Sequence, residues 1–365
     1  MQSQRYIFTV FILFFSFYTF AQSSQISKVN TSGAEAYFKV THLLESGKSE
    51  PAVHWQTLFS TPVYQMMIAG NAIDTNKLKT EMMHVFSPSS STLTNTFSTK
   101  ELYHKSYKDN QGKLERYISD LQKPGLEDSI KVLLYPYLPP RLQSDSLFPV
   151  LFYLNYGAPE ATGFNGIVIN DLLHSYRIDN YKFGLLAAHE AFHSIVSAAF
   201  QQALKKNINY NAADFGLLYF MENVSEEGIA DLIDKPTLLK EGSPVYNEVK
   251  QLTTNDQVLS LKYIKSIDSL LKLCVTSEHV LQQYNGFADL ASTFGSNGGH
   301  IPGRFMATII QKQGLLQKHI ITIEDPISFF LTYNEATKQS GLTYPVFSKE
   351  SIEYLQQLKA KYWQE

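Results

Sequence analysis

The chain contains a single cysteine, Cys274, among its 365 residues. One thiol cannot form an intramolecular disulfide, which excludes the disulfide-stapled folds and leaves stability to core packing. Cys274 lies in the largely apolar segment 267–275, so we expect a buried and inert thiol. With 44% hydrophobic and 18% charged residues, the composition is that of a folded globular protein.

The chain also lacks an excess of basic residues. Lys and Arg together number 31 against 34 Asp and Glu, which gives a net charge of −3 at pH 7. Proteins that bind nucleic acid usually present a broad basic face to it. We therefore expect no nucleic-acid partner.

Long apolar runs are missing except at the amino terminus, where residues 6–20 form an almost uninterrupted one. Arg5 precedes this run, and Thr19 and Ala21 fit the small-residue pattern before a cleavage site. These features predict a signal peptide over residues 1–21, with an uncleaved anchor as the alternative. The run is shorter than the about 20 residues that a membrane span needs. We therefore expect an exported protein, periplasmic or secreted, with no stable membrane span in its mature chain.

What the chain does contain is the pattern H-E-x-x-H at residues 189–193. No Pro or Gly interrupts residues 185–205, which predicts a helix around the pattern. On a helix, His189 and His193 lie one turn apart on one face, where two imidazoles can bind one Zn²⁺ at about 2.0–2.1 Å. Glu190 lies beside the first histidine and can accept a proton from water as a general base.

A catalytic zinc ion usually has three protein ligands. Glu227, 34 residues beyond His193 (227 − 193) on a second predicted helix, is the candidate for the third. Asp231 lies four residues further along the same face, where it can accept the second N–H of a ligating imidazole. Glu226 competes for the ligand role. We favour Glu227 because the residue four after Glu226 is Ala230, which offers no such partner.

Together these segments resemble the gluzincin-type zinc metallopeptidases, whose pattern is H-E-x-x-H and then, after an intervening helical segment, a glutamate, small residues and an aspartate. Residues 189–193 match the first part, and residues 227–231 (E-G-I-A-D) match the second. The resemblance implies these roles: metal ligands His189, His193 and Glu227, general base Glu190, and Asp231 as the acceptor behind a ligating histidine.

The same resemblance implies a helical active-site core with a small sheet. It also implies that the strand at residues 166–170 lies at the sheet edge and pairs with an extended peptide. Val196 and Ala199 stand where the metzincins have Gly and His, which argues against that three-histidine arrangement. More loosely, the whole chain resembles an uncharacterised group of exported bacterial zinc-dependent peptidases.

Amide hydrolysis also needs a donor for the developing oxyanion. His300, in the glycine-rich segment 298–303, is the candidate, and Arg304 and Tyr284 are alternatives. A loop histidine can approach a cleft. The competing interpretation is that His300 and Arg304 only cap or solvate a helix end.

The expected fold class is α+β, predominantly helical, with a zinc-peptidase-like core, a small antiparallel sheet and a helical active-site pair. The strand-forming segments 149–156 and 166–170 lie close together with turn residues between them, which favours antiparallel pairing. We expect four regions: a signal peptide over 1–21, an N-terminal helical region over 22–145, a zinc-binding catalytic core over 146–235 and a C-terminal helical region over 236–365.

The predicted function is that of an exported zinc-dependent metallopeptidase. It would hold one Zn²⁺ and hydrolyse a peptide or protein substrate with Glu190 as general base. The alternative is a non-catalytic secreted binding or scaffold protein with a structural or relic metal site. A third hypothesis is a zinc hydrolase that acts on a non-peptide amide. The sequence indicates neither a peptide preference nor an oligomeric state.

Overall fold

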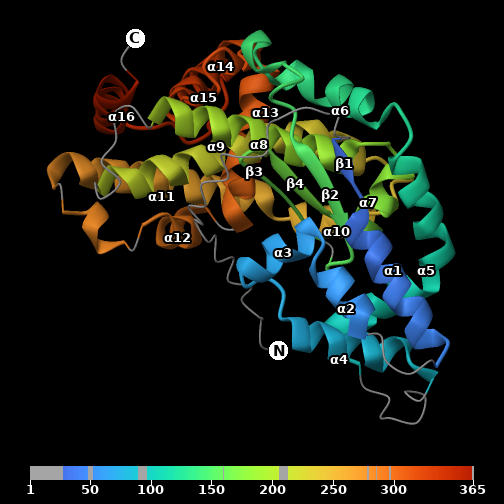
Figure 1. The fold of residues 1–365 in the computed structure, drawn as a ribbon. Coiled ribbons are helices and arrows are strands. Elements are labelled where there is room, and N and C mark those ends of the chain that lie inside the picture. Colours follow the sequence, from blue (N-terminus) through green and yellow to red (C-terminus); the bar gives the residue numbers. More distant parts are fainter. Residues whose placement is uncertain are drawn as a thin grey trace. The chain divides into compact units, whose positions relative to one another are not determined.

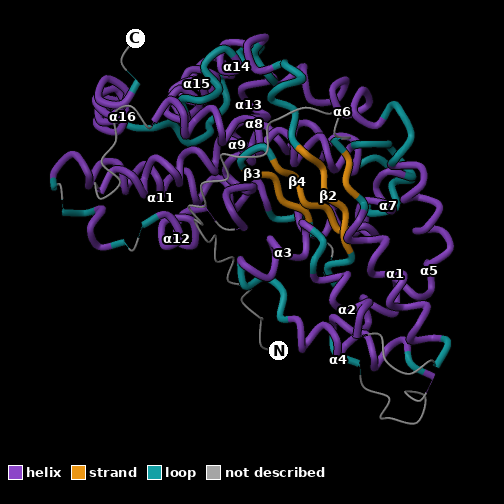
Figure 2. Tube along the Cα trace, in the orientation of Figure 1, coloured by secondary structure: helices purple, strands orange, loops and turns teal. Residues whose placement is uncertain are grey.

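The computed structural model describes residues 28–47, 52–88, 97–158, 160–204, 213–277, 279–284, 286–295 and 297–363. The predicted signal peptide, residues 1–21, lies outside these ranges. Helices make up most of the described chain, and four short strands form one small sheet (Figures 1 and 2). The predicted α+β class, mainly helical, is confirmed.

The chain divides into two compact units, each assembled from separate stretches of sequence. The first unit comprises Met1–Glu127, Val150–Thr162 and Ile167–Asn180, and the second comprises Asp128–Pro149, Gly163–Gly166 and Tyr181–Glu365. The predicted division into four consecutive regions stays a prediction.

Some helices of the first unit begin at a side chain that caps them. Asp74 accepts two backbone N–H groups at the start of α4, and Ser98 and Glu101 form a capping box at the start of α5. The helices of this unit are α1 (Ser32–Glu45), α2 (Ala52–Phe59), α3 (Pro62–Ala69), α4 (Thr75–Phe86), α5 (Thr99–Leu121) and α7 (Leu172–Asp179). The helix α6 (Leu126–Leu134) follows α5 and leads into the second unit.

The sheet has four strands in the order β1-β2-β4-β3. Their bounds are β1 (Val29–Asn30), β2 (Val150–Leu154), β3 (Ala161–Phe164) and β4 (Ile167–Asp171). β2 pairs with β4 in parallel, with Val150 opposite Ile167 and Leu154 opposite Asp171. The predicted antiparallel pairing of these two segments is therefore wrong, and the strand expected at the edge lies inside the sheet.

The reason is the short strand β3, which the sequence analysis took for part of a turn. Asn165 and Gly166 connect β3 to β4, and both have positive φ angles, 46° and 79°. Such a two-residue connection reverses the chain direction. Because the chain reverses once before β3 and again after it, β2 and β4 run the same way, and β3 takes the edge.

The second unit is built around α9, a long helix that packs against α8, α12, α13 and α15 (Figure 1). Apolar residues on several of its faces are buried, as expected for a helix covered on all sides. The helices of this unit are α8 (Leu185–Leu204), α9 (Ala213–Leu238), α10 (Tyr246–Thr253), α11 (Asp256–Thr276), α12 (Phe287–Leu290), α13 (His300–Lys312), α14 (Leu316–Ile320), α15 (Pro326–Ser340) and α16 (Lys349–Tyr362).

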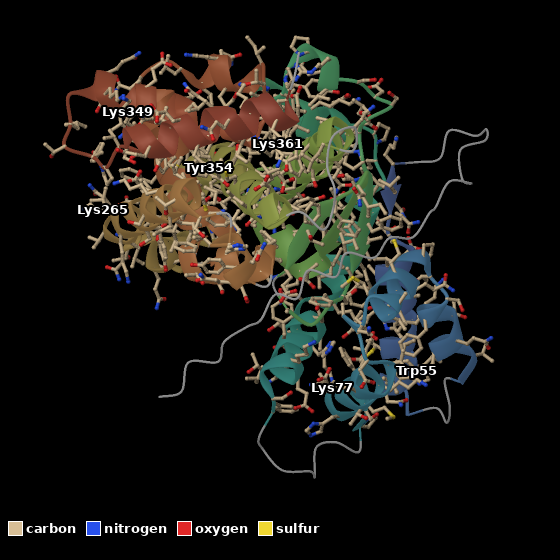
Figure 3. All side chains as sticks on the ribbon, turned by 90° about the vertical axis from the view of Figure 1, so that its left-hand side faces the viewer. Trp55, Lys77, Lys265, Lys349, Tyr354 and Lys361 are labelled. Atoms are coloured by element: carbon tan, nitrogen blue, oxygen red, sulfur yellow. The ribbon has the colours of Figure 1, made fainter. Side chains whose placement is uncertain are left out.

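The last helix, α16, is hydrogen-bonded to the first turn of α9. Lys361 and Tyr362 of α16 both donate hydrogen bonds of 2.7 Å to Asp214 of α9. Tyr354, on the same helix, interacts with the thiol of Cys274 (Figure 3 labels Tyr354 and Lys361). The predicted burial of Cys274 is confirmed, and burial raises the pKa of this thiol to about 11.

Two glycines let α9 and α13 cross at close range. A Cβ atom on Gly228 of α9 would lie 2.5 Å from the carbonyl oxygen of Gly303. A Cβ atom on Gly303 would lie 2.1 Å from the carbonyl oxygen of Val224. Contacts this short cannot occur, so only glycine fits at either position. The crossing places the first turn of α13 beside the middle of α9.

Among the helices of the described residues, none is long and apolar enough to cross a membrane. Many exposed side chains of the second unit are charged, and Lys265 of α11 and Lys349 of α16 are examples (Figure 3).

Candidate metal centre

The H-E-x-x-H residues lie in the buried half of α8. His189, Glu190 and His193 are each exposed by less than a tenth, at 5%, 8% and 8%. The helix begins after Gly184, which has a φ of 77°, and Asn180 is the C-cap of the preceding helix α7. One turn apart on α8, the two histidines direct their Nε2 atoms toward each other at 3.2 Å.

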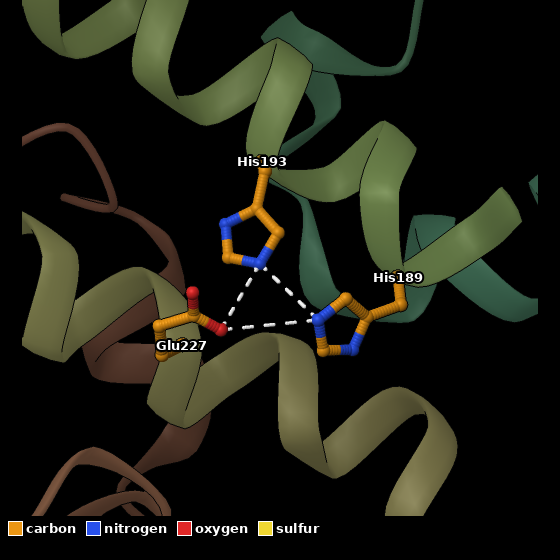
Figure 4. Close-up of side chains that lie close together, drawn as sticks. All are labelled: His189, His193 and Glu227. Atoms are coloured by element: carbon orange, nitrogen blue, oxygen red, sulfur yellow. Dashed lines mark hydrogen bonds and ion pairs between the residues drawn. The ribbon is translucent and has the colours of Figure 1, made fainter. Parts of the chain in front are cut away.

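Glu227 reaches this pair from α9. Its Oε2 atom lies 3.3 Å from Nε2 of His193 and 3.8 Å from Nε2 of His189 (Figure 4). The ligand atoms of the three residues all lie within 4.8 Å of one another. The structure therefore brings together the three side chains predicted as metal ligands.

The spacing of these atoms fits one tetrahedral zinc ion. Ligand atoms about 2.0–2.1 Å from such an ion lie about 3.3–3.4 Å from one another, and the observed separations are 3.2, 3.3 and 3.8 Å. Oε2 of Glu227 is buried, and it lies 3.3 Å from Nε2 of His193 and 3.1 Å from Nδ1 of His300. A buried carboxylate is costly unless positive charge compensates it, and a metal ion or a protonated imidazole can supply that charge.

The charge of Glu227 suits this role. Burial by itself raises the pKa of this carboxyl, but the imidazoles of His300 and His193 outweigh burial and lower it to about 2. The group is an anion throughout the neutral range, which is the form that binds zinc.

Each imidazole also has a carboxylate behind it. Nδ1 of His193 hydrogen-bonds Oε2 of Glu226 at 3.3 Å, and Oδ1 of Asp234 lies 3.3 Å from Nδ1 of His189. Both carboxylates are buried on α9. A carboxylate that accepts the Nδ1–H of histidine leaves Nε2 without a proton and available to a metal.

Sequence reasoning had assigned this supporting role to Asp231. In the structure, the carboxylate of Asp231 lies 3.1 Å from Nζ of Lys235 and 3.2 Å from Nδ1 of His300. Burial raises the pKa of Asp231, but Lys235 and His300 outweigh it and hold the pKa well below its usual value. Asp234, which sequence reasoning missed, is the carboxylate nearest to Nδ1 of His189. Its position seven residues after Glu227, on the same helix face, was the available signal.

Glu190 is buried beside the two histidines. Burial raises the pKa of its carboxyl, and the neighbouring His189 and His193 oppose this effect. A raised pKa makes a carboxylate a stronger base near neutral pH. The edge strand β3 touches the same turn of α8, since a Cβ atom on Gly163 would lie 1.8 Å from the carbonyl oxygen of Glu190.

His300 begins α13 directly after Gly298 and Gly299, which both have positive φ angles, 67° and 97°. Its Nδ1 lies 3.1 Å from Oε2 of Glu227, and its ring stacks on that of His189 with centroids 6.2 Å apart. Burial lowers the pKa of His300, but Glu227 and Asp231 outweigh burial and raise it to about 9.

The two alternatives to His300 have other contacts. Arg304 pairs with Asp256 at the start of α11, and the ring of Tyr284 packs edge-on against Phe294 with centroids 5.7 Å apart. Of the three candidate donors, His300 is the one whose described contacts include Glu227. The structure thus places His300 beside two of the candidate ligands, Glu227 and His189.

Two histidines and a glutamate on neighbouring buried helices, with a further glutamate at the second position of H-E-x-x-H, form the kind of centre found in zinc-dependent peptidases. The chain belongs to the family described as "Putative zinc dependent peptidase (DUF5700)", whose family model matches residues 55–341. That range includes all the site residues described above. No curated protein matches the chain, and no solved structure does.

Proposed function

We propose that this protein is an exported metallopeptidase that hydrolyses peptide bonds at the centre formed by α8, α9 and α13. The observation that carries the proposal is the convergence of three buried ligand atoms, 3.2 to 3.8 Å apart, beside the buried carboxylate of Glu190. His189, His193 and Glu227 would hold one zinc ion. When bound, zinc lowers the pKa of a water molecule toward about 7 and polarises the scissile carbonyl.

Glu190 is the general base of this proposal. Its carboxylate accepts the proton of the attacking water and then passes that proton to the leaving amine. Burial favours the protonated form of the group, so the proton is held between the two steps.

His300 is the proposed donor to the oxygen of the scissile carbonyl. Asp231 and Glu227 both face its Nδ1, which leaves Nε2 free to donate. Its pKa of about 9 keeps the ring charged at neutral pH, and its side chain is 31% exposed, so a substrate can reach it. A cationic donor stabilises negative charge that develops on the carbonyl oxygen.

The edge strand β3 is the proposed contact for an extended peptide. It replaces the strand at residues 166–170 in this role, because β4 has neighbours on both sides. Gly163 of β3 lies against the backbone of Glu190, and the adjacent Phe164 is 41% exposed. A peptide that added to such an edge would run past the catalytic turn of α8.

The first test is the zinc content of the chain from Gln22 onward, beside a Glu227→Ala variant. We expect about one zinc per chain in the unmodified protein and a marked loss in the variant. Zinc retained by the variant would mean that a residue other than Glu227 is the third ligand. No zinc in either protein, after refilling with the metal, would contradict the proposal.

Glu190→Gln separates catalysis from metal binding. We expect this variant to keep its zinc and to lose peptide hydrolysis by about 10²–10⁴-fold, since the amide cannot accept the proton. Turnover of a peptide library at the unmodified rate would rule out the mechanism. A zinc-loaded chain that cleaves no peptide, even unmodified, would favour the non-catalytic binding protein, and cleavage of simple amides alone would favour the third hypothesis.

Export is part of the proposal and rests on residues 1–21. Amino-terminal sequencing of the protein recovered from the periplasm or the medium should begin at Gln22. Recovery of a chain that still starts at Met1 would favour the uncleaved anchor.

A further inference from the structure

Lys235 is a partly buried cation close to the centre, and neither hydrolysis nor zinc ligation uses it. It is on the last turns of α9, and its side chain is 21% exposed. Its Nζ lies 3.1 Å from Oδ1 of Asp231 and 2.9 Å from Oδ2 of Asp234. Those two carboxylates are almost fully buried, at 1% and 2% exposure. The ammonium group is thus enclosed by two anions.

Each of the two carboxylates faces a different histidine of the centre. Asp234 lies 3.3 Å from Nδ1 of His189, and Asp231 lies 3.2 Å from Nδ1 of His300. Lys235 therefore contacts the carboxylate that faces His189, a proposed zinc ligand, and the carboxylate that faces His300, the proposed oxyanion donor. Its contacts with the two aspartates link it to both histidines.

The same aspartates also form part of a second set of metal-binding atoms. His189, Asp231 and Asp234 offer ligand atoms that all lie within 4.8 Å of one another, and all three residues are buried. Nδ1 of His189 and Oδ1 of Asp234 are buried atoms that lie 3.3 Å apart. Two buried carboxylates need a compensating cation, and here Lys235 supplies it. Burial lowers the pKa of this ammonium, but the carboxylates outweigh burial and raise it above its usual value, so the charge is permanent.

We propose that Lys235 is a positioning residue that takes the place of a second cation. Its ammonium holds Asp234 behind His189 and Asp231 behind His300. Because its charge compensates both carboxylates, a second metal ion does not bind there. This inference rests on the proposed zinc site formed by His189, His193 and Glu227.

The test compares the zinc-loaded protein with its Lys235→Met and Lys235→Arg variants. Metal per chain is measured at increasing free zinc, and affinity is measured by competition with a chelator. Lys235→Met leaves Asp231 and Asp234 uncompensated. We expect it to bind a second, weaker zinc ion and to hold the first about 10-fold or more less tightly, as loss of a supporting partner does. Lys235→Arg keeps the charge and should bind one ion.

A charge-balanced variant guards against misfolding. Asp231→Asn combined with Lys235→Met removes one charge of each sign, so it leaves fewer buried charges unpaired. We expect it to bind one ion only, because the second ligand set has lost a carboxylate.

Each outcome bears on one claim. One ion of unchanged affinity in Lys235→Met, or two ions in the unmodified or the charge-balanced protein, would overturn the inference and leave the proposed function standing. No ion in the unmodified protein would overturn the proposed function itself, and with it the inference.

Discussion

The centre is organised by neighbouring residues of α9 that take different roles. Glu227 faces the Nε2 atoms of both histidines, while Glu226, one residue earlier, hydrogen-bonds the far side of His193. Successive helical residues are about 100° apart, so two adjacent glutamates can reach opposite sides of one imidazole. In the proposed centre, therefore, Glu227 is placed to bind the metal and Glu226 to support His193 from behind.

The sequence favoured Glu227 as ligand for a reason that the structure does not bear out in detail. The argument relied on Asp231 as the partner of a ligating imidazole, whereas its carboxylate contacts Lys235 and His300. Helical periodicity predicts which residues share a face, but not which side chain of a neighbouring helix each one reaches. That depends on where α8, α9 and α13 cross, which no local pattern shows.

Glu226→Gln tests the role of the carboxylate behind His193. Gln keeps the size and one acceptor oxygen but loses the charge, so the imidazole becomes a weaker ligand. We expect zinc affinity to fall about 10- to 100-fold, measured by chelator competition. The matched control is Glu241→Gln, at an exposed position beyond the end of α9. Equal affinities in the two variants would show that Glu226 does not support the metal.

At the scale of elements, α9 continues past a proline. A proline inside a helix ordinarily kinks or ends it, but α9 includes Pro236 and continues to Leu238. Pro236 has no N–H to offer the carbonyl of Leu232, four residues earlier. The hydroxyl of Tyr137 donates to that carbonyl at 3.1 Å. Because a distant residue satisfies the freed oxygen, the last turn survives and holds Asp234 and Lys235 in place.

The sheet contains a hairpin whose turn is encoded by two residues of the sequence. Asn165–Gly166 is a strong two-residue hairpin signal, and it joins β3 to β4. The flanking segment A-T-G-F contains two small residues and carries little strand propensity, so its sequence does not predict a strand. The helices around the site had clearer signals, since their apolar patterns are long and uninterrupted.

Gly228→Ala tests the crossing of α9 and α13. The added methyl group would meet the carbonyl oxygen of Gly303 at 2.5 Å, so the helices must move apart and carry Glu227 and His300 with them. We expect a loss of about 1–3 kcal/mol in the free energy of unfolding, together with weaker zinc binding. Urea unfolding and chelator competition measure the two effects.

The matched control for this variant is Gly112→Ala, in the exposed middle of α5. A Cβ atom there meets nothing within 4 Å. Alanine should leave zinc binding unchanged and stabilise the helix by about 0.5–1 kcal/mol. If Gly228→Ala behaved like this control, the close crossing would have no part in building the centre.

At the scale of the whole molecule, the residues of the candidate centre all belong to the second unit. The family match over residues 55–341 nevertheless extends through both units. The first unit has a buried polar cluster of its own. Asp171 is 1% exposed, caps α7, and accepts hydrogen bonds from the hydroxyls of Tyr103 and Tyr107.

This cluster predicts how stability changes with pH. Burial raises the pKa of Asp171 to about 7, although its hydrogen bonds oppose the rise. In the unfolded chain the pKa of an aspartate is about 3.9. Between these two values the folded state binds the proton more tightly than the unfolded state does. The contribution of Asp171 to stability is therefore most favourable below about pH 4, and falls as the pH rises to 7 by at most about 1.4 kcal/mol per pH unit.

Asp171→Asn removes this titration and keeps a side chain that can cap α7. The quantity to measure is the difference in unfolding free energy between the unmodified protein and the variant, from urea denaturation at several values between pH 5 and pH 8. Groups common to both proteins cancel in this difference. We expect the variant to gain stability relative to the unmodified protein as the pH rises to 7, and the difference to level off above it. A difference that is constant over the whole range would mean that Asp171 is already ionised at pH 5, with its pKa lowered by the two tyrosines and not raised by burial.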